Sequence, residues 1–193
     1  MADVAPGSVC VFCGARDGDD PAFARAAESL GRVLAENGWR LVYGAGDVGL
    51  MGRLASSARA AGGETFGVIP VHLMAREAAR RDLSRLVITE NMHERKKVMF
   101  MNADAIVTLP GGAGSLDEFF EVMTWRQLGL HDKPIYLFNI NGYWDDLVAL
   151  IDHVVARGFA AESFRRYMSV VTSVEELAAC LRRDLSRSTA RAE

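Results

Sequence analysis

The residues with the clearest chemical potential lie in one stretch, AIVTLPGGAGSLDEFFEVM, which spans residues 105–123. It opens with a short apolar run, typical of a strand buried on both faces, and continues with Gly111, Gly112 and Gly114. Glycines allow a tight turn and let the backbone approach a ligand closely. The apolar spacing becomes helical from Ser115, and the first N–H groups of a helix bind anions such as phosphate. The stretch therefore predicts an anion-binding turn between a strand and a helix.

Glu118 falls in the first turn of that expected helix, beside the anion-binding turn. One interpretation is structural: Ser115 as N-cap and Glu118 three residues later would form a capping box, in which each side chain satisfies the other's backbone N–H. The other is functional, because a carboxylate beside a phosphate-bearing ligand would face a sugar carbon that becomes positive during reaction. The two interpretations are compatible, and the residue types alone do not choose between them.

A dense run of charge, HERKK at residues 93–97, lies near the start of another expected helix at residues 92–102. Such a run is ordinarily a solvated helix face. Here it follows an expected strand at residues 86–88, so its first residues emerge at the carboxyl edge of the sheet, as the glycine turn does. Open α/β sheets bind ligands at that edge. We therefore expect the run to contribute to the same site.

A literal GxGxxG occurs at residues 44–49, after an expected strand at residues 39–43. A dinucleotide fingerprint also needs an acidic residue at the end of the next strand, where it holds a ribose. That strand, at residues 65–69, is followed by Pro-Val-His without a carboxylate. The motif therefore favours a second glycine wall of the same nucleotide pocket, beginning at Gly44, over an NAD site.

Cys10 and Cys13 form a CxxC, but an offset of three within the expected strand at residues 8–13 points them to opposite faces. A redox pair would instead lie at the start of a helix. Burial in the core is the better interpretation. The four histidines show no metal-ligand spacing, and we expect neither a metal nor a cofactor.

Expected strands and helices alternate along the whole chain. The pattern predicts a single Rossmann-like, doubly wound α/β domain with a mostly parallel sheet and helices on both faces. The domain is expected to fill residues 1–193, with a core at about residues 8–187 and loose ends at residues 1–7 and 188–193. Besides the elements above, we expect strands at 134–138 and 167–171 and helices at 21–37, 50–61, 144–157 and 174–187.

Half of the 193 residues are hydrophobic, which is enough for one domain with a sizeable core. A net charge of −3 and a pI of about 5.8 imply no general affinity for nucleic acid. No apolar run approaches the roughly 20 residues of a membrane helix, and the N-terminus lacks a basic-then-apolar signal. We expect a cytoplasmic protein that does not associate with membranes.

Two motifs, MHERK at residues 92–96 and PGGAGSLDE at residues 110–118, resemble the Lonely Guy family of cytokinin riboside 5′-monophosphate phosphoribohydrolases, which are often mislabelled lysine decarboxylases. The family pattern is PGGxGTxxE, and here Ser115 replaces the threonine while keeping its hydroxyl. The resemblance extends over about residues 8–181. Two departures, in residues 78–91 and in the second glycine turn, bear on base selectivity more than on the reaction.

The resemblance implies hydrolysis of the N-glycosidic bond of an adenine-type nucleoside 5′-monophosphate, either AMP or an N6-prenylated nucleotide, giving free base and ribose 5-phosphate. It implies that Arg95 and Glu118 are the catalytic pair. It also implies a homodimer or larger assembly that completes the site. The implied substrate-binding positions are Glu77, Arg95, Lys96, Gly111, Gly112, Ala113, Gly114, Ser115 and Glu118, together with Gly14 and Gly44 from the matching turns.

Three alternatives have different sequence requirements. A nucleotide-binding module without chemistry, on the same fold, would not need the pair of Arg95 and Glu118. An NAD oxidoreductase would need the missing ribose carboxylate. A pyridoxal phosphate decarboxylase would need a Schiff-base lysine, and the chain's lysines, Lys96, Lys97 and Lys133, lie in a charged cluster or in a turn.

Overall fold

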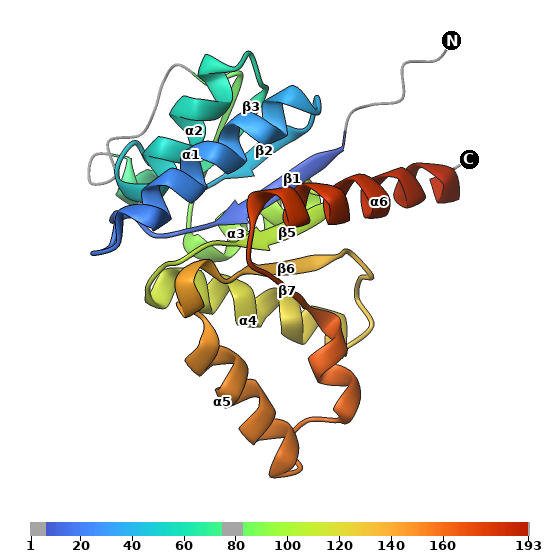
Figure 1. The fold of residues 1–193 in the computed structure, drawn as a ribbon. Coiled ribbons are helices and arrows are strands. Elements are labelled where there is room, and N and C mark those ends of the chain that lie inside the picture. Colours follow the sequence, from blue (N-terminus) through green and yellow to red (C-terminus); the bar gives the residue numbers. More distant parts are fainter. Residues whose placement is uncertain (1–6, 75–82, 193) are drawn as a thin grey trace.

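Seven parallel strands form one sheet in the order β4-β3-β2-β1-β5-β6-β7 within residues 7–74 and 83–192, which the computed structural model describes (Figure 1). This arrangement confirms the expected doubly wound α/β class, and every strand pair is parallel. The strands are β1 (Ser8–Phe12), β2 (Arg40–Tyr43), β3 (Thr65–Pro70), β4 (Arg85–Thr89), β5 (Ala105–Thr108), β6 (Ile135–Phe138) and β7 (Ser169–Val171). The α-helices are α1 (Pro21–Glu36), α2 (Gly49–Ala60), α3 (Met92–Met101), α4 (Ala113–Gln127), α5 (Asp145–Ala156) and α6 (Val174–Ala192), and the 3-10 helices are η1 (Val71–Leu73), η2 (Ile140–Gly142) and η3 (Glu162–Tyr167).

The expected elements match the observed ones closely except at two helix ends and at the start of β7. That strand begins at Ser169, two residues after the expected start, because Tyr167 belongs to η3. Helix α4 begins at Ala113, two residues before the expected start. The apolar spacing marks only the buried face of a helix, and the first two residues of α4 are exposed, so the spacing missed them. Helix α6 continues to Ala192, where the sequence analysis expects a loose tail from residue 188. Its last residues contain neither glycine nor proline, so nothing local ends the helix earlier.

Alternate side chains along the strands enter two separate cores, one on each face of the sheet. Helices α1, α2 and α6 cover one face, and helices α3, α4 and α5 cover the other (Figure 1). Cys10 and Cys13 are buried and free, and they belong to different cores, which confirms the interpretation of the CxxC as a packing feature.

Strand β1 lies where the strand order reverses. The chain moves outward from it through β2, β3 and β4 and then returns to β5 on its other side. The helices that follow β1 and β5 therefore lie on opposite faces, α1 on one and α4 on the other. Such a reversal opens a crevice beyond the carboxyl ends of the two central strands, which is the usual ligand position in open α/β sheets.

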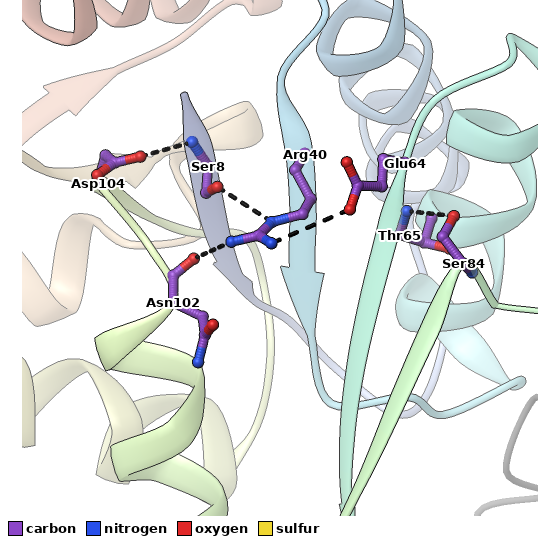
Figure 2. Close-up of polar contacts among 7 residues, drawn as sticks. All are labelled: Ser8, Arg40, Glu64, Thr65, Ser84, Asn102 and Asp104. Carbon is purple, nitrogen blue, oxygen red and sulfur yellow. Dashed lines mark hydrogen bonds and ion pairs between the residues drawn. The ribbon is translucent and has the colours of Figure 1, made fainter. Parts of the chain in front are cut away.

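A polar network holds the amino edge of the sheet, at the opposite ends of the strands (Figure 2). The Arg40 side chain donates hydrogen bonds to Ser8 Oγ on β1 and to the Asn102 carbonyl after α3, each at 3.1 Å. Its guanidinium also lies 4.0 Å from the Glu64 carboxylate. The Ser8 backbone N–H donates to Asp104 at 2.8 Å. These contacts join two strands and the end of α3 on the side away from the crevice.

Arg40→Ala should lower the free energy of unfolding by about 1–3 kcal/mol, because a half-buried carbonyl and hydroxyl lose their charged donor. Urea unfolding followed by circular dichroism measures the change. Arg166→Ala, at an exposed arginine, is the control and should change the unfolding free energy far less. Equal losses in the two variants would show that the network does not stabilise the sheet.

Candidate active site

A cavity of about 660 Å³ lies at the carboxyl edge of the sheet, where the strand order reverses. Residues that follow β1, β2 and β5 line it, together with residues near the starts of α3 and α4. The topology therefore brings together most of the site residues expected from the sequence. Those that line the cavity are Gly14, Gly44, Arg95, Gly111, Gly112, Gly114, Ser115 and Glu118.

The glycine turn places the N-terminus of α4 at the cavity. The N-cap of this helix is Gly112, and no side chain makes a capping hydrogen bond there. The capping-box interpretation of Ser115 and Glu118 is therefore wrong. Because the helix begins at Ala113, Ser115 lies inside its first turn and Glu118 lies in its second. A capping role no longer accounts for the position of the Glu118 carboxylate.

The ends of β1 and β5 meet beneath this turn. Gly14 N donates a hydrogen bond to the Pro110 carbonyl at 3.0 Å. A Cβ on Gly111 would stand 2.1 Å from the hydroxyl oxygen of Ser115 and 3.0 Å from Gly14 N. The Ser115 residue is only 3% exposed. Gly111 is thus required by the close packing of the turn against the neighbouring strand end and the first turn of α4.

Gly112 and Gly114 are glycines for a different reason. Within the described residues, apart from chain neighbours and the backbone of α4 itself, no atom lies within 4 Å of a Cβ added at either position, so the described packing leaves room for a side chain. Both residues line the cavity and both are exposed. Side chains there would project into the space over the helix N-terminus, and their lack keeps that space accessible to an anion.

Arg95 is a buried cation in the cavity wall, with only 5% of its surface exposed. The Asn91 side chain caps α3 by accepting a hydrogen bond from Glu94 N at 3.0 Å, which fixes the start of the helix. Arg95 Nη2 donates to the Gly44 carbonyl at 2.8 Å, and Nε donates to the Val68 carbonyl at 3.2 Å. These two backbone acceptors hold the guanidinium across β2 and β3.

Lys96, the next residue, is not among the residues that line the cavity. Successive helical residues are rotated by about 100°, and its ammonium instead contacts α4, at 2.9 Å from Asp117 and 3.2 Å from Glu121. Burial lowers the pKa of Lys96, but hydrogen bonds to the two carboxylates raise it by more, so the net shift is upward. Lys96 therefore joins α3 to α4 through charge pairing.

Glu118 is half-buried and lines the cavity together with Arg95. Its charge acts on Cys13, which follows β1: burial raises the pKa of this thiol far above its ordinary value, and the Glu118 carboxylate raises it further. Arg95 lowers the same pKa, by less. The thiol is consequently neutral at physiological pH, and the charge in this part of the cavity resides on the carboxylate and the guanidinium.

Tyr143 is a cavity residue that the sequence reasoning missed. Its hydroxyl donates a hydrogen bond to the Gly111 carbonyl at 2.7 Å, and its ring contacts Phe23 edge to face with the ring centroids 5.3 Å apart. It lies just beyond β6, whose carboxyl end opens at the same edge as the glycine turn. The edge rule that drew attention to the start of α3 applies equally here and would have identified Tyr143.

Two further expected positions are not among the described residues that line the cavity. Ala113 belongs to the first turn of α4 but is not among the lining residues. Glu77 lies outside the described residues. Within residues 7–74 and 83–192, no group of three or more His, Cys, Asp or Glu side chains is arranged to hold a metal ion. In the same part of the chain, no helix combines the length and apolar character needed to cross a membrane.

The fold and the cavity define a Rossmann-like α/β protein with a glycine turn and a helix N-terminus at the reversal of strand order. The family model described as "Possible lysine decarboxylase" matches residues 51–181. The chain belongs to this family, the Lonely Guy family that its two motifs indicate.

Curated relatives cover most of the chain. A cytokinin riboside 5′-monophosphate phosphoribohydrolase of Rhodococcoides fascians is 44% identical over 92% of this chain and 90% of the relative. Proteins with the same name in Oryza sativa subsp. japonica and Arabidopsis thaliana are each 42% identical over 88% of this chain, and the match covers 70% and 78% of those relatives.

Solved structures confirm the fold at lower identity. The molybdenum cofactor carrier protein of Chlamydomonas reinhardtii is 18% identical, with a TM-score of 0.71 over 94% of this chain and 99% of that one. The molybdenum cofactor binding protein of Rippkaea orientalis is 20% identical, with a TM-score of 0.69 over 92% and 96% of the two chains. At these identities the likeness shows a shared fold alone.

Lys96→Met should lower the free energy of unfolding by about 1 kcal/mol near neutral pH, because the variant keeps the packing but loses the pairing of a buried ammonium with one exposed and one partly buried carboxylate. The Lys96 pKa is raised above its unfolded value of 10.5. Its contribution to stability is therefore fully present below pH 10.5 and is lost as the pH rises through the higher folded-state pKa.

The measurement is the difference in unfolding free energy between Lys96→Met and the parent protein as a function of pH. It should shrink above pH 10.5. Lys97→Met, at the exposed neighbouring lysine, is the matched control and should show no comparable difference. A Lys96→Met difference that stays constant into the alkaline range would contradict the pairing.

Proposed function

We propose that this protein hydrolyses the N-glycosidic bond of an adenine-type nucleoside 5′-monophosphate, either AMP or an N6-prenylated nucleotide, and releases the free base and ribose 5-phosphate. The observation that carries the proposal is that Arg95 and Glu118 line one cavity with an anion-binding turn. The names of relatives that are 42–44% identical support the same reaction.

The 5′-phosphate binds at the N-terminus of α4 in this proposal. The helix offers N–H groups without a side-chain cap, and the positive end of the helix dipole favours an anion there. Gly112 and Gly114 leave the approach open, while Gly111 and Ser115 form the packed base of the turn. Ala113 contributes its backbone within the same turn. Anchoring the phosphate in this way fixes the sugar relative to the protein side chains.

Glu118 acts on the ribose in this proposal. Breaking the bond between C1′ and the base builds positive charge on the sugar, as in glycoside hydrolysis. Glu118 lies one helical turn beyond the phosphate-binding N–H groups, so its carboxylate can stabilise that charge or orient the attacking water. The water supplies the hydroxyl to C1′ and a proton to the departing base, so the products are ribose 5-phosphate and the neutral base.

Arg95 serves the base end of the substrate. Its guanidinium is held by carbonyls at the end of β2 and in β3, whereas the glycine turn of residues 111–114 follows β5, two strand positions away from β2. Neighbouring strands are about 4.8 Å apart, so the two anchors are separated by roughly 10 Å, comparable to the length of a nucleoside monophosphate. This separation supports a role for Arg95 in stabilising negative charge on the leaving base rather than in binding the phosphate.

The remaining substrate-binding residues have separate proposed roles. Gly14 and Gly44 line the cavity beneath the substrate. Glu77 is proposed to contact the base or a sugar hydroxyl. Lys96 supports the site indirectly, because its pairing with Asp117 and Glu121 holds the helix that carries Arg95 against the helix that carries Glu118.

We also propose that the protein acts as a homodimer or larger assembly with the site near the interface. Helices α3 and α4, which carry Arg95 and Glu118, end in large apolar side chains that face solvent. Met101, Leu128 and Leu130 are each 66–67% exposed. They lie at the ends of α3 and α4 that are opposite to the cavity, so a partner surface that covered them would bury apolar area on the helices that build the site, at the amino edge of the sheet.

Glu118→Gln should reduce the rate of base release by about 10²- to 10³-fold, the typical effect of removing one group that stabilises the transition state. Chromatographic measurement of base released from AMP and from N6-isopentenyl-AMP tests this. Glu175→Gln, at an exposed glutamate in the first turn of α6 and outside the cavity lining, is the control and should keep the parent rate. Full activity in Glu118→Gln would remove the carboxylate from the mechanism, and nucleotide binding by the parent protein without base release would favour a non-catalytic module.

Tyr143→Phe should raise the KM for nucleoside monophosphates by about two- to tenfold, because the phosphate-binding turn loses the hydrogen bond at the Gly111 carbonyl. Inhibition by the free nucleoside should be unaffected, since it lacks the phosphate. Tyr167→Phe is the control: this hydroxyl donates to Ser163 and lies outside the cavity lining. An equal effect on nucleoside and nucleotide would place Tyr143 at another part of the substrate.

A further inference from the structure

The glycine turn after β2 carries the GxGxxG of residues 44–49, and the proposed reaction does not explain why residue 44 is a glycine. We infer that Gly44 is a positioning residue for Arg95: its missing side chain makes room for the guanidinium, and its carbonyl sets the orientation. The inference rests on the proposed function, because it assigns Gly44 to the same site.

The space around Gly44 is filled by Arg95. A Cβ at this position would stand 2.0 Å from Arg95 Nη2 and 3.0 Å from Arg95 Cζ. The next neighbour is Met51 Sδ, at 3.2 Å. The φ of Gly44 is outside the positive range, so its backbone conformation is open to any residue. The Arg95 guanidinium is therefore the main steric reason for a glycine at this position.

Three contacts define the plane of that guanidinium. Nη2 donates to the Gly44 carbonyl at 2.8 Å, Nε donates to the Val68 carbonyl at 3.2 Å, and Nη1 lies 3.8 Å from Met92 Sδ. A planar fork whose nitrogens meet acceptors at fixed positions loses its freedom to rotate. A side chain at residue 44 would displace Nη2 from the first acceptor and tilt the whole group.

The last glycine of the motif serves a second internal contact. Gly49 has a φ of +61°, and a Cβ there would stand 2.3 Å from the Ala15 carbonyl carbon and 2.4 Å from Arg16 N. Ala15 and Arg16 belong to the segment after β1 that lines the cavity. Two glycines of the motif thus admit protein atoms, an arginine head and a backbone turn, where a dinucleotide fingerprint would admit a pyrophosphate.

The test is a double-mutant cycle between Gly44→Ala and Arg95→Ala. Gly44→Ala alone should reduce kcat for base release by about 10- to 100-fold, the cost of a misplacement near 1 Å. In the Arg95→Ala background the added methyl meets no guanidinium, so it should change the residual rate and the nucleotide affinity by no more than about twofold. Affinity is measured by titration calorimetry with AMP.

Gly7→Ala is the matched control, because a Cβ there also presses on a side chain, that of Leu185, but at the amino edge of the sheet. It should leave kcat and KM at the parent values. Arg95→Lys is the second variant, for the case that Gly44→Ala does not fold. It keeps the charge but lacks the Nη2 donor, and it should lose about tenfold or more in kcat.

A readout independent of catalysis separates this inference from the proposed reaction. The Arg95 Nε–H resonance, assigned by its loss in Arg95→Lys, should exchange slowly with solvent in the parent protein and rapidly in Gly44→Ala. Equal rate losses from Gly44→Ala in both backgrounds, full activity in Arg95→Lys, or an unchanged Nε–H signal would each overturn the positioning role. Failure of the parent protein to release any base would overturn the proposed function, while the resonance would still decide the role of Gly44.

Discussion

The hydrogen bond from Gly14 N to the Pro110 carbonyl joins the ends of the two strands between which the strand order reverses. The site depends on this contact, because the chain leaves β1 toward one face and β5 toward the other. Helices α1 and α4 consequently diverge and leave a cavity above the joined ends. Gly111 has no room for a Cβ, because it packs against Ser115 in the first turn of α4 and against Gly14 N at the end of β1. The helix N-terminus and the cavity floor are therefore set by one backbone arrangement.

Two adjacent cations on α3 divide two tasks between them. Arg95 donates to the carbonyl of Gly44, which follows β2, and to the carbonyl of Val68 in β3, and these two acceptors orient its guanidinium. Lys96 reaches two carboxylates on α4, which neutralise its charge and hold the helices together. The rotation between successive helical residues sends the two side chains in different directions. One turn of α3 thus supplies a cation to the cavity and an ion-paired lysine that holds α3 against α4.

The two edges of the sheet differ in structure, because the cavity lies at the carboxyl edge. At the amino edge Arg40 and its partners close the strand ends with hydrogen bonds to side chains and carbonyls (Figure 2). At the carboxyl edge several polar groups face the cavity, and glycines keep protein atoms out of it at Gly112 and Gly114. The hydrogen-bonded network thus lies at the amino edge, away from the cavity. The binding side keeps open space and oriented charge.

Much of the fold was predictable from local pattern. Alternating buried strands and amphipathic helices, with no linker, indicated a doubly wound sheet, and the offset of Cys10 and Cys13 placed them on opposite faces. The glycines at 111, 112 and 114 and the position of Glu118 were readable because backbone freedom and residue spacing are local properties. The start of α4 was not, since its first two residues carry no apolar signal.

What only the tertiary structure decided is which neighbour each residue meets. Sequence spacing could not show that Arg95 lines the cavity while Lys96 contacts α4, because their partners come from segments far away along the chain. It did not indicate Tyr143, whose contact with Gly111 spans 32 positions. It placed Gly44 in a glycine wall of the pocket but could not show that Gly44 admits a guanidinium. The sequence by itself determined the elements and the chemical groups, and packing between distant segments determined where those groups point.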